Sequence, residues 1–287
     1  MKICITTTFD RNYTLAGRTL FKSIRRHTDC TGIDFKVITS DPEVVREFGA
    51  ENCHVVTDEI KARYANVKDH PQNPLNRFSH SLYRYEMFSF ENYDRVVLID
   101  ADCLCPADIS YLFSEDLSSY DLISVEDYIV SRHWGLHNLP EFIAVAGSGG
   151  KGRPELHEKG LNMLNLRQRM LDGKIDVQAS ILVANKNIVN RAWYDRLLHY
   201  ANTTEYTYAL EMGILNDFIY QDGLKIKLLP VEWNYQDCYE IYVTSIPVPA
   251  HPRMVHCQQS KPFKNERSAL PECLRKWHDL WWEECNH

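Results

Sequence analysis

Hydrophobic and polar positions follow two different periods over residues 1–100. Strand-like segments rich in β-branched and apolar residues lie at 2–8, 35–40, 53–58 and 95–100. Segments whose apolar residues recur at helical spacing separate them, at 14–27, 41–49 and 79–90. Asp41 and Pro42 suit the first positions of the second helix, and Gly49 suits its end. This alternation predicts an α/β fold with a doubly wound, mostly parallel sheet flanked by helices.

The pattern after residue 100 is less regular. Strands are predicted at 121–127, 180–185 and 225–230. Helices are predicted at 157–172, 187–202, 209–221 and 271–284. Because neither an internal repeat nor a linker interrupts the chain, we expect a single domain.

Charge disfavours one class of partner. The 287 residues include 32 Lys and Arg against 39 Asp and Glu, which gives a formal net charge of -7. A protein that binds nucleic acid by neutralising its phosphates needs a basic face, so we expect no nucleic-acid partner. A small phosphate-bearing ligand needs only a local site and stays compatible with this charge.

The sequence also bears on location. It has no run of the about 20 apolar residues that would span a bilayer. Its start, MKICITTTF, is too short and too polar for a signal peptide and suits a first strand. The 9 cysteines form no C-x-x-C motif, which favours reduced thiols and a cytoplasmic location.

The most informative motif is RVVLIDADCL, in which an apolar strand ends in Asp100, Ala101 and Asp102. Ligand sites in open α/β sheets lie at the carboxyl ends of strands. A turn directly after the strand can direct both carboxylates to one point, where a divalent cation would relieve their repulsion. An acidic turn with no ligand is the alternative interpretation.

A second candidate group lies in the segment HCQQSKPF, which contains His256 and Lys261. Histidine is a common ligand of Mn²⁺ or Zn²⁺, and the lysine ammonium is a point charge that binds phosphate. Taken alone, His256 would more often be structural. Its combination with Asp100 and Asp102 favours a metal ligand.

The turn between the first strand and the first helix, TTTFDRNY, carries hydroxyls and an aromatic ring. Such groups at this place suit a nucleobase and a ribose, although an ordinary capped loop is the alternative. The candidate residues of this turn are Thr7, Thr8, Asp10, Asn12 and Tyr13.

Together these motifs resemble the glycogenin-like and lipopolysaccharide galactosyltransferase-like enzymes of glycosyltransferase family 8. The resemblance covers nearly the whole chain in the expected order. It is carried by the opening T-T-x-x-x-x-Y, the strand ending in D-A-D with a D-I-x-x-L-F after it, LPVEWNY and HCQQSKPF. Arg84 stands where the family has a basic residue that helps to hold the donor, and Asn234 stands at the asparagine of L-P-x-x-Y-N.

The resemblance implies a GT-A type fold and a metal-dependent retaining transfer of a hexose, glucose or galactose, from a UDP-sugar to an acceptor hydroxyl. The catalytic domain would cover 1–264, with a nucleotide-binding half at 1–102, a donor-sugar and acceptor half at 103–264, and a helical tail at 265–287. The acceptor class is left open among a glycan, a lipid-linked sugar and a protein.

The resemblance also implies roles for residues. Asp100, Asp102 and His256 would hold Mn²⁺, with Mg²⁺ as the alternative, and Lys261 would contact the phosphates. A metal and a lysine there would stabilise the charge that develops on the diphosphate leaving group. The nucleotide-sugar site would comprise Thr7, Thr8, Asp10, Asn12, Tyr13, Arg84, Asp100, Ala101, Asp102, Asn234 and Lys261.

The sequence departs from the family pattern near the reacting sugar. Gln178-Ala179-Ser180 replaces N-[SA]-G, Glu211-Met212 replaces D-Q, and the His-to-Lys spacing is five instead of six. Gln178 and Glu211 are the catalytic candidates, since Glu211 keeps a carboxylate for sugar hydroxyls whereas Met212 has no amide. A catalytically silent nucleotide-sugar-binding protein is therefore one alternative. A D-x-D phosphatase is another, although Leu104 stands where that class has a threonine.

Two further segments have competing interpretations. The Gly-rich segment 146–154 lacks the G-K-[ST] ending of a phosphate-binding loop, and a mobile loop over the acceptor cleft is expected instead. Leu270, Leu274, Trp277 and Trp281 recur at helical spacing and favour a packed core or docking helix. The alternative is peripheral contact of 271–284 with the inner membrane face, which the neighbouring acidic residues disfavour.

Overall fold

The computed structural model describes residues 1–67, 79–128, 175–204 and 211–286 of the chain. Within these ranges a central seven-stranded sheet has the order β3-β2-β1-β4-β7-β6-β8. The strands are β1 (Ile3–Thr8), β2 (Ile33–Thr39), β3 (Cys53–Val55), β4 (Arg95–Ile99), β6 (Leu122–Val125), β7 (Ile181–Asn185) and β8 (Ile226–Leu229). The predicted loop at 146–154 and the predicted helix at 157–172 lie outside the described residues.

The sheet is mostly parallel, as the sequence predicts. β1 pairs in parallel with both β2 and β4, β2 pairs in parallel with β3, and β6 pairs in parallel with β8. β7 alone among these strands runs antiparallel to its two neighbours, β4 and β6. Because β1 and β4 are parallel neighbours, their carboxyl ends lie at the same edge of the sheet. The turn after β1 and the acidic turn after β4 are thereby brought side by side.

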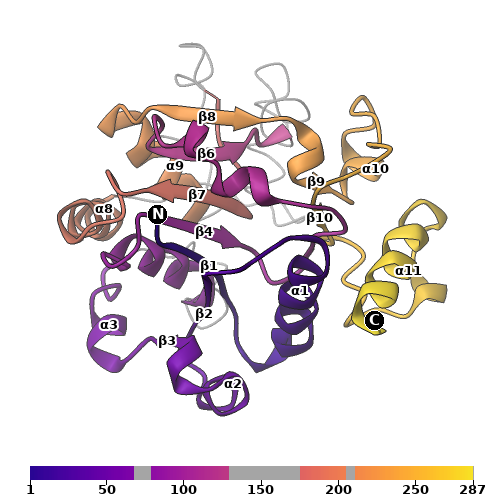
Figure 1. The fold of residues 1–287 in the computed structure, drawn as a ribbon, viewed down its shortest axis with the longest axis horizontal. Coiled ribbons are helices and arrows are strands. Elements are labelled where there is room, and N and C mark those ends of the chain that lie inside the picture. The colour runs from indigo at the N-terminus through magenta and orange to yellow at the C-terminus, as the bar shows by residue number, and fades with distance from the viewer. Residues whose placement is uncertain (68–78, 129–174, 205–210, 287) are drawn as a thin grey trace, which may run out of the picture.

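Helices cover both faces of this sheet (Figure 1). α1 lies on one face and α8 on the opposite one. The described helices are α1 (Thr14–His27), α2 (Pro42–Phe48), α3 (Asp58–Ala62), α4 (Ser79–Leu82), α8 (Arg191–Thr203), α9 (Glu211–Asp222), α10 (Tyr239–Tyr242) and α11 (Glu272–Asn286). Along β4, Val96 and Leu98 join the core under α8 and α9, while Val97 and Ile99 join the core under α1. A strand buried on both faces explains the unbroken apolar run in the sequence.

Local signals placed several helix ends correctly. The Asp41 side chain accepts a hydrogen bond from the backbone N–H of Glu43, and Pro42 occupies the first turn of α2. Gly49 ends this helix with φ 85°, a conformation that glycine adopts without strain. The helix predicted at 187–202 begins four residues late, at Arg191, because the Asn190 side chain accepts from the Trp193 N–H and caps it there.

The segment predicted as one helix at 79–90 has a different form. One α-helical turn, α4, is followed by a 3₁₀ helix at Tyr83–Ser89. Residues 83–88 are all buried, so this segment has no solvent face and is not an amphipathic helix. Its side chains are bound from several directions, with Arg84 held by two backbone carbonyls and Glu86 by two tyrosine hydroxyls. Tertiary contacts therefore outweigh helical propensity here.

A small second sheet lies beside the main one. β10 (Val255–His256) pairs antiparallel with β5 (Cys103–Leu104) and parallel with β9 (Tyr235–Gln236). β5 follows the acidic turn directly, so this pairing places His256 next to that turn. The small sheet thus joins the segment after β4 to the C-terminal part of the chain.

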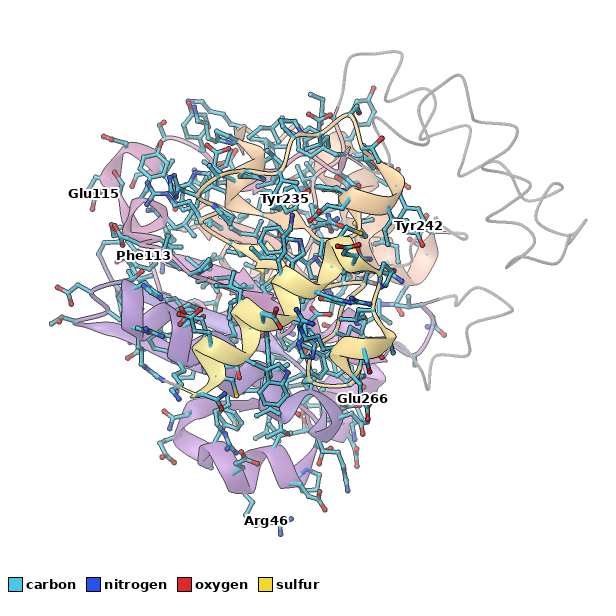
Figure 2. All side chains as sticks on the ribbon, turned by 90° about the vertical axis from the view of Figure 1, so that its right-hand side faces the viewer. Arg46, Phe113, Glu115, Tyr235, Tyr242 and Glu266 are labelled. Atoms are coloured by element: carbon cyan, nitrogen blue, oxygen red, sulfur yellow. The ribbon has the colours of Figure 1, made fainter. Side chains whose placement is uncertain are left out.

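α11 covers the small sheet and packs on α1. In Figure 2, which looks at this side, α11 lies in front with Tyr235 beside it, and the rings of Tyr235 and Trp277 are 5.6 Å apart. Leu274, Trp277 and Trp281 are buried, which confirms the docking helix. Peripheral membrane contact of 271–284 stays an alternative, in which these three buried side chains would take no part. No helix in the described ranges is long and apolar enough to cross a bilayer.

Candidate functional site

Two carboxylates and an imidazole converge at the carboxyl end of β4. One ligand atom from each of Asp100, Asp102 and His256 lies within 4.8 Å of the others. Asp100 begins a turn, in which its carbonyl accepts a hydrogen bond from the Cys103 N–H at 3.0 Å. That turn directs both carboxylates to one point, as the sequence predicts. The pairing of Cys103 with His256 then brings the imidazole to the same point.

The charges around Asp102 are strongly coupled. His256 Nε2 lies 3.2 Å from one carboxylate oxygen and Lys261 Nζ lies 3.0 Å from the other. Burial alone would raise the pKa of Asp102, but His256 and Lys261 hold that pKa well below its usual range. At Asp100 the effect of burial prevails. Burial raises the pKa of this carboxyl by more than Arg84 and His256 lower it. Burial lowers the pKa of His256, but the carboxylates of Asp102, Asp100 and Asp237 together outweigh burial, so the net shift of the pKa is upward.

This donor set fits a divalent cation. Two carboxylates and one imidazole are a common ligand set of Mn²⁺, and the carboxylates alone would also suit Mg²⁺. His256 Nδ1 is buried and has no partner within the described part of the chain. The side chains of Asp102 and His256 are 10% and 8% exposed, so a cation held there would be largely screened from water.

Arg84 connects Asp100 to Glu211. Its guanidinium is anchored by the backbone carbonyls of Ser81 and Ala179, both at 3.0 Å. Nη2 lies 3.3 Å from Asp100 Oδ1 and 3.6 Å from Glu211 Oε1. Burial raises the pKa of Glu211, and Arg84 opposes that shift. Arg84 and Glu211 therefore lie next to the Asp100, Asp102 and His256 cluster, joined to it by ion pairs around the buried Arg84.

Lys261 joins the cluster to the opening turn. Its Nζ donates a hydrogen bond to the Tyr13 hydroxyl at 3.0 Å. The centroids of the Tyr13 and Phe263 rings are 5.1 Å apart. Lys264 Nζ lies 3.9 Å from the centroid of the Tyr13 ring. Lys261 has φ 36°, a left-handed backbone conformation that is uncommon for a residue with a side chain. The HCQQSKPF segment and the first turn thus form one surface.

Other residues of the opening turn mainly shape it. Asp10 caps the 3₁₀ turn at Arg11–Tyr13 by accepting from the Asn12 N–H at 2.9 Å and from its side-chain amide at 3.2 Å. These contacts join Asp10 and Asn12 to each other, and none joins them to the acidic cluster. Thr8 is partly exposed. Thr7 is fully buried, and its hydroxyl has no partner within the described ranges.

Asn234 lies beside the acidic turn through Ser180, and Gln178 is a buried residue two positions before Ser180. Asn234 Nδ2 donates to the Ser180 hydroxyl at 2.6 Å, and its Oδ1 is buried without a partner in the described structure. The backbone carbonyl of Ser180 accepts from the N–H of Asp100 at 2.9 Å. The Asn216 side chain binds both backbone groups of Val177, which fixes the segment that leads into Gln178. Hydrogen bonds through Ser180 therefore attach Asn234 to the acidic turn.

Sequence reasoning missed Asp237. This carboxylate is fully buried and accepts the backbone N–H groups of Gln259 and Ser260 at 2.8 and 2.7 Å. No periodicity or motif indicated Asp237, because its hydrogen-bond partners lie in a distant segment of the sequence, the loop after β10. The sequence offered one signal for Asp237, its position three residues after the candidate Asn234.

Comparison with known proteins identifies the family. The family model described as glycosyl transferase family 8 matches residues 4–266. The chain belongs to this family. Membership places the chain in a glycosyltransferase family that is typically metal-dependent, and it favours this class over the D-x-D phosphatase alternative. No curated protein matches the sequence significantly.

Solved glycosyltransferase structures share the fold of this family 8 chain. LgtC, a galactosyltransferase solved with donor and acceptor sugar analogues, superposes with a TM-score of 0.57 at 15% identity, covering 99% of this chain and 95% of LgtC. GlyE of Streptococcus pneumoniae gives 0.60 at 16% identity, covering 100% of this chain and 61% of GlyE. The bifunctional glycosyltransferase WbbM superposes with a TM-score of 0.60 at 19% identity, and the match covers 99% of this chain and 51% of WbbM.

This family 8 chain thus spans about half the length of WbbM and about three-fifths of GlyE. At these identities the likeness shows the fold alone. It agrees with a single-domain, GT-A type α/β architecture, as the motifs implied.

Proposed function

We propose that this protein is a retaining hexosyltransferase that moves glucose or galactose from a UDP-sugar to an acceptor hydroxyl. The observation that carries the proposal is the convergence of Asp100, Asp102 and His256 with Lys261 and Tyr13. These residues come from three distant segments and together offer a cation site, a phosphate-binding ammonium and an aromatic ring. A nucleoside diphosphate needs that combination.

Asp100, Asp102 and His256 would hold Mn²⁺ or Mg²⁺. When bound, the cation would neutralise the diphosphate as the bond to the sugar breaks. Lys261 Nζ lies within hydrogen-bond distance of both Asp102 and Tyr13, so it can add a further positive charge to the phosphates. Thr7, Thr8 and Tyr13 would face the uracil.

Glu211, Arg84 and Gln178 would serve the donor sugar. The Glu211 carboxylate lies 3.6 Å from Arg84, which in turn lies 3.3 Å from Asp100. A carboxylate fixed in this way can accept hydrogen bonds from sugar hydroxyls and orient the ring over the diphosphate. LgtC is described as a galactosyltransferase, which supports a hexose as the transferred group. Ala101 and Asn234 would complete the donor site.

One observation favours a catalytically silent binding protein as the second candidate. Met212 replaces the amide of the family motif, and it packs against the core under α8 and α9. A side chain held in the core offers no polar group to the sugar. This candidate retains the UDP-sugar and metal sites but lacks turnover.

A single experiment separates the two candidates. The protein is incubated with Mn²⁺ and UDP-glucose or UDP-galactose, with and without a mixture of glycan acceptors, and released UDP is measured. Release that exceeds the level of an Asp102→Asn variant supports the transferase. UDP binding by calorimetry with no release from either donor would establish the silent protein.

The proposed location is the cytoplasm. All nine cysteines are free thiols in the structure, which supports a reducing compartment. Cell fractionation tests this proposal, since the protein should be recovered with cytoplasmic markers, and recovery in a secreted or separately membrane-enclosed fraction would contradict it.

A further inference from the structure

Asp237 is a buried carboxylate whose two oxygens both bind backbone N–H groups of one loop. It follows β9 directly and is fully buried. Its own N–H donates to the carbonyl of His256 at 3.1 Å. Its two carboxylate oxygens accept the N–H groups of Gln259 and Ser260, one each. Both oxygens are therefore used to hold the loop that runs from His256 to Lys261.

That loop is short and strongly bent. The Lys261 N–H donates to the carbonyl of Cys257 at 3.1 Å, which closes a tight turn. The Asn265 side chain donates to the carbonyl of Ser260 at 2.8 Å. Lys261 itself has φ 36° and is followed by Pro262, and a residue before proline is normally extended. An unfavourable backbone conformation persists only where the surroundings enforce it.

We propose that Asp237 is a positioning residue that holds Lys261 in its left-handed conformation and so delivers the ammonium to the diphosphate. The inference rests on the proposed UDP-sugar function of the same site. It accounts for the His-to-Lys spacing of five residues, since a shorter loop reaches Asp102 and Tyr13 only if its bend is fixed. Nζ is then placed 3.0 Å from each of these side chains.

The inference separates Asp237 from the metal ligands. The hydrogen bond between Asp237 and His256 joins backbone atoms beside the β9–β10 pairing, and the two side chains interact only electrostatically. Replacing the carboxylate by an amide removes one acceptor and turns an NH₂ group toward a backbone N–H. The loop after Cys257 would shift, while the sheet that positions His256 would remain.

The test compares two affinities of Asp237→Asn. Calorimetry measures Mn²⁺ alone, and then UDP at saturating Mn²⁺. We expect UDP affinity to fall at least tenfold and Mn²⁺ affinity to stay within threefold of the wild type. A residue that is merely structural would change both affinities together.

A double-mutant cycle with Lys261→Ala tests the route of the effect. If Asp237 acts through Lys261, the Asp237→Asn change has no further effect on UDP affinity in the Lys261→Ala background. A further tenfold loss in that background would overturn the inference.

Asp121→Asn is the matched control. The Asp121 carboxylate also accepts a backbone N–H, from Lys225 at 2.8 Å, and a side-chain amide from Asn187 at 2.8 Å. It precedes β6, at the opposite edge of the sheet from the acidic turn. We expect its UDP affinity to match the wild type.

The outcomes distinguish the two proposals. A wild-type protein that binds no UDP with Mn²⁺ would overturn the proposed function and this inference with it. Wild-type binding that Asp237→Asn leaves unchanged would overturn this inference alone. If the variant does not fold, hydrogen exchange of the wild type decides. The N–H groups of Gln259 and Ser260 must exchange slowly without UDP, and fast exchange would overturn the inference.

Discussion

The ammonium of Lys261 donates a hydrogen bond to the hydroxyl of Tyr13 at 3.0 Å, across 248 residues of sequence. The same ammonium lies 3.0 Å from Asp102 Oδ2. One side chain therefore links the opening turn, the acidic turn and the loop after β10. This link makes Lys261 the residue whose loss should separate nucleotide binding from metal binding.

Lys261→Ala should weaken UDP binding by about 1.5–3 kcal/mol, the range for hydrogen bonds to charged groups. Tyr13→Phe removes only the hydroxyl and should cost about 0.5–1.5 kcal/mol. Calorimetry with UDP and saturating Mn²⁺ measures both. A loss within error of zero for Lys261→Ala would remove this residue from the phosphate site.

Asp102→Asn should abolish Mn²⁺-dependent binding of UDP, because the amide carries no charge for the cation. Asp108→Asn is the control. Its carboxylate lies six residues later and binds the N–H and hydroxyl of Ser110. Calorimetric titration with UDP, with and without Mn²⁺, gives the answer. An Asp102→Asn protein with wild-type affinity would contradict the metal assignment.

Glu211→Gln should lower turnover of the UDP-sugar at least tenfold and leave UDP affinity within twofold. The reason is that the proposed contacts of Glu211 are with the sugar and not with the nucleotide. Glu211→Asp restores the carboxylate of the family motif and should keep most of the turnover. Kinetics of UDP release and calorimetry with UDP make the comparison. Equal losses in affinity and turnover would place Glu211 elsewhere.

Glu86 should make folding stability depend on pH. Burial raises its pKa, but hydrogen bonds from His54, Tyr194 and Tyr64 outweigh burial and lower the pKa below its ordinary value of 4.5. A lowered folded pKa adds stability that is complete above 4.5 and is lost as pH falls through the folded value.

Glu86→Gln should therefore cost about 1–3 kcal/mol at pH 7, and less as the pH approaches 3. Urea unfolding across this range measures the difference. Glu59→Gln is the control, because that side chain is 84% exposed and should change stability by less than about 0.5 kcal/mol. A penalty for Glu86→Gln that is independent of pH would refute this account.

The sequence by itself determined the seven strands of the main sheet and most helix ends, although the strand predicted at 53–58 ends at Val55 because Thr57 caps α3. Alternating periods and turn chemistry are local, so β1, β4 and the ends of α2 could be predicted from neighbouring residues. The acidic turn could also be predicted, since an apolar strand that ends in two carboxylates is a local pattern.

Tertiary structure alone decided how the site is assembled. The pairing of β10 with β5 sets His256 beside Asp102, and the Asp237 carboxylate holds the loop that carries Lys261. Buried contacts also turned residues 83–89 into a 3₁₀ helix where the periodicity predicted an α-helix. These features depend on hydrogen bonds between groups far apart in the chain. No spacing of neighbouring residues encodes them, because each bond forms only after the sheet has brought its two ends together.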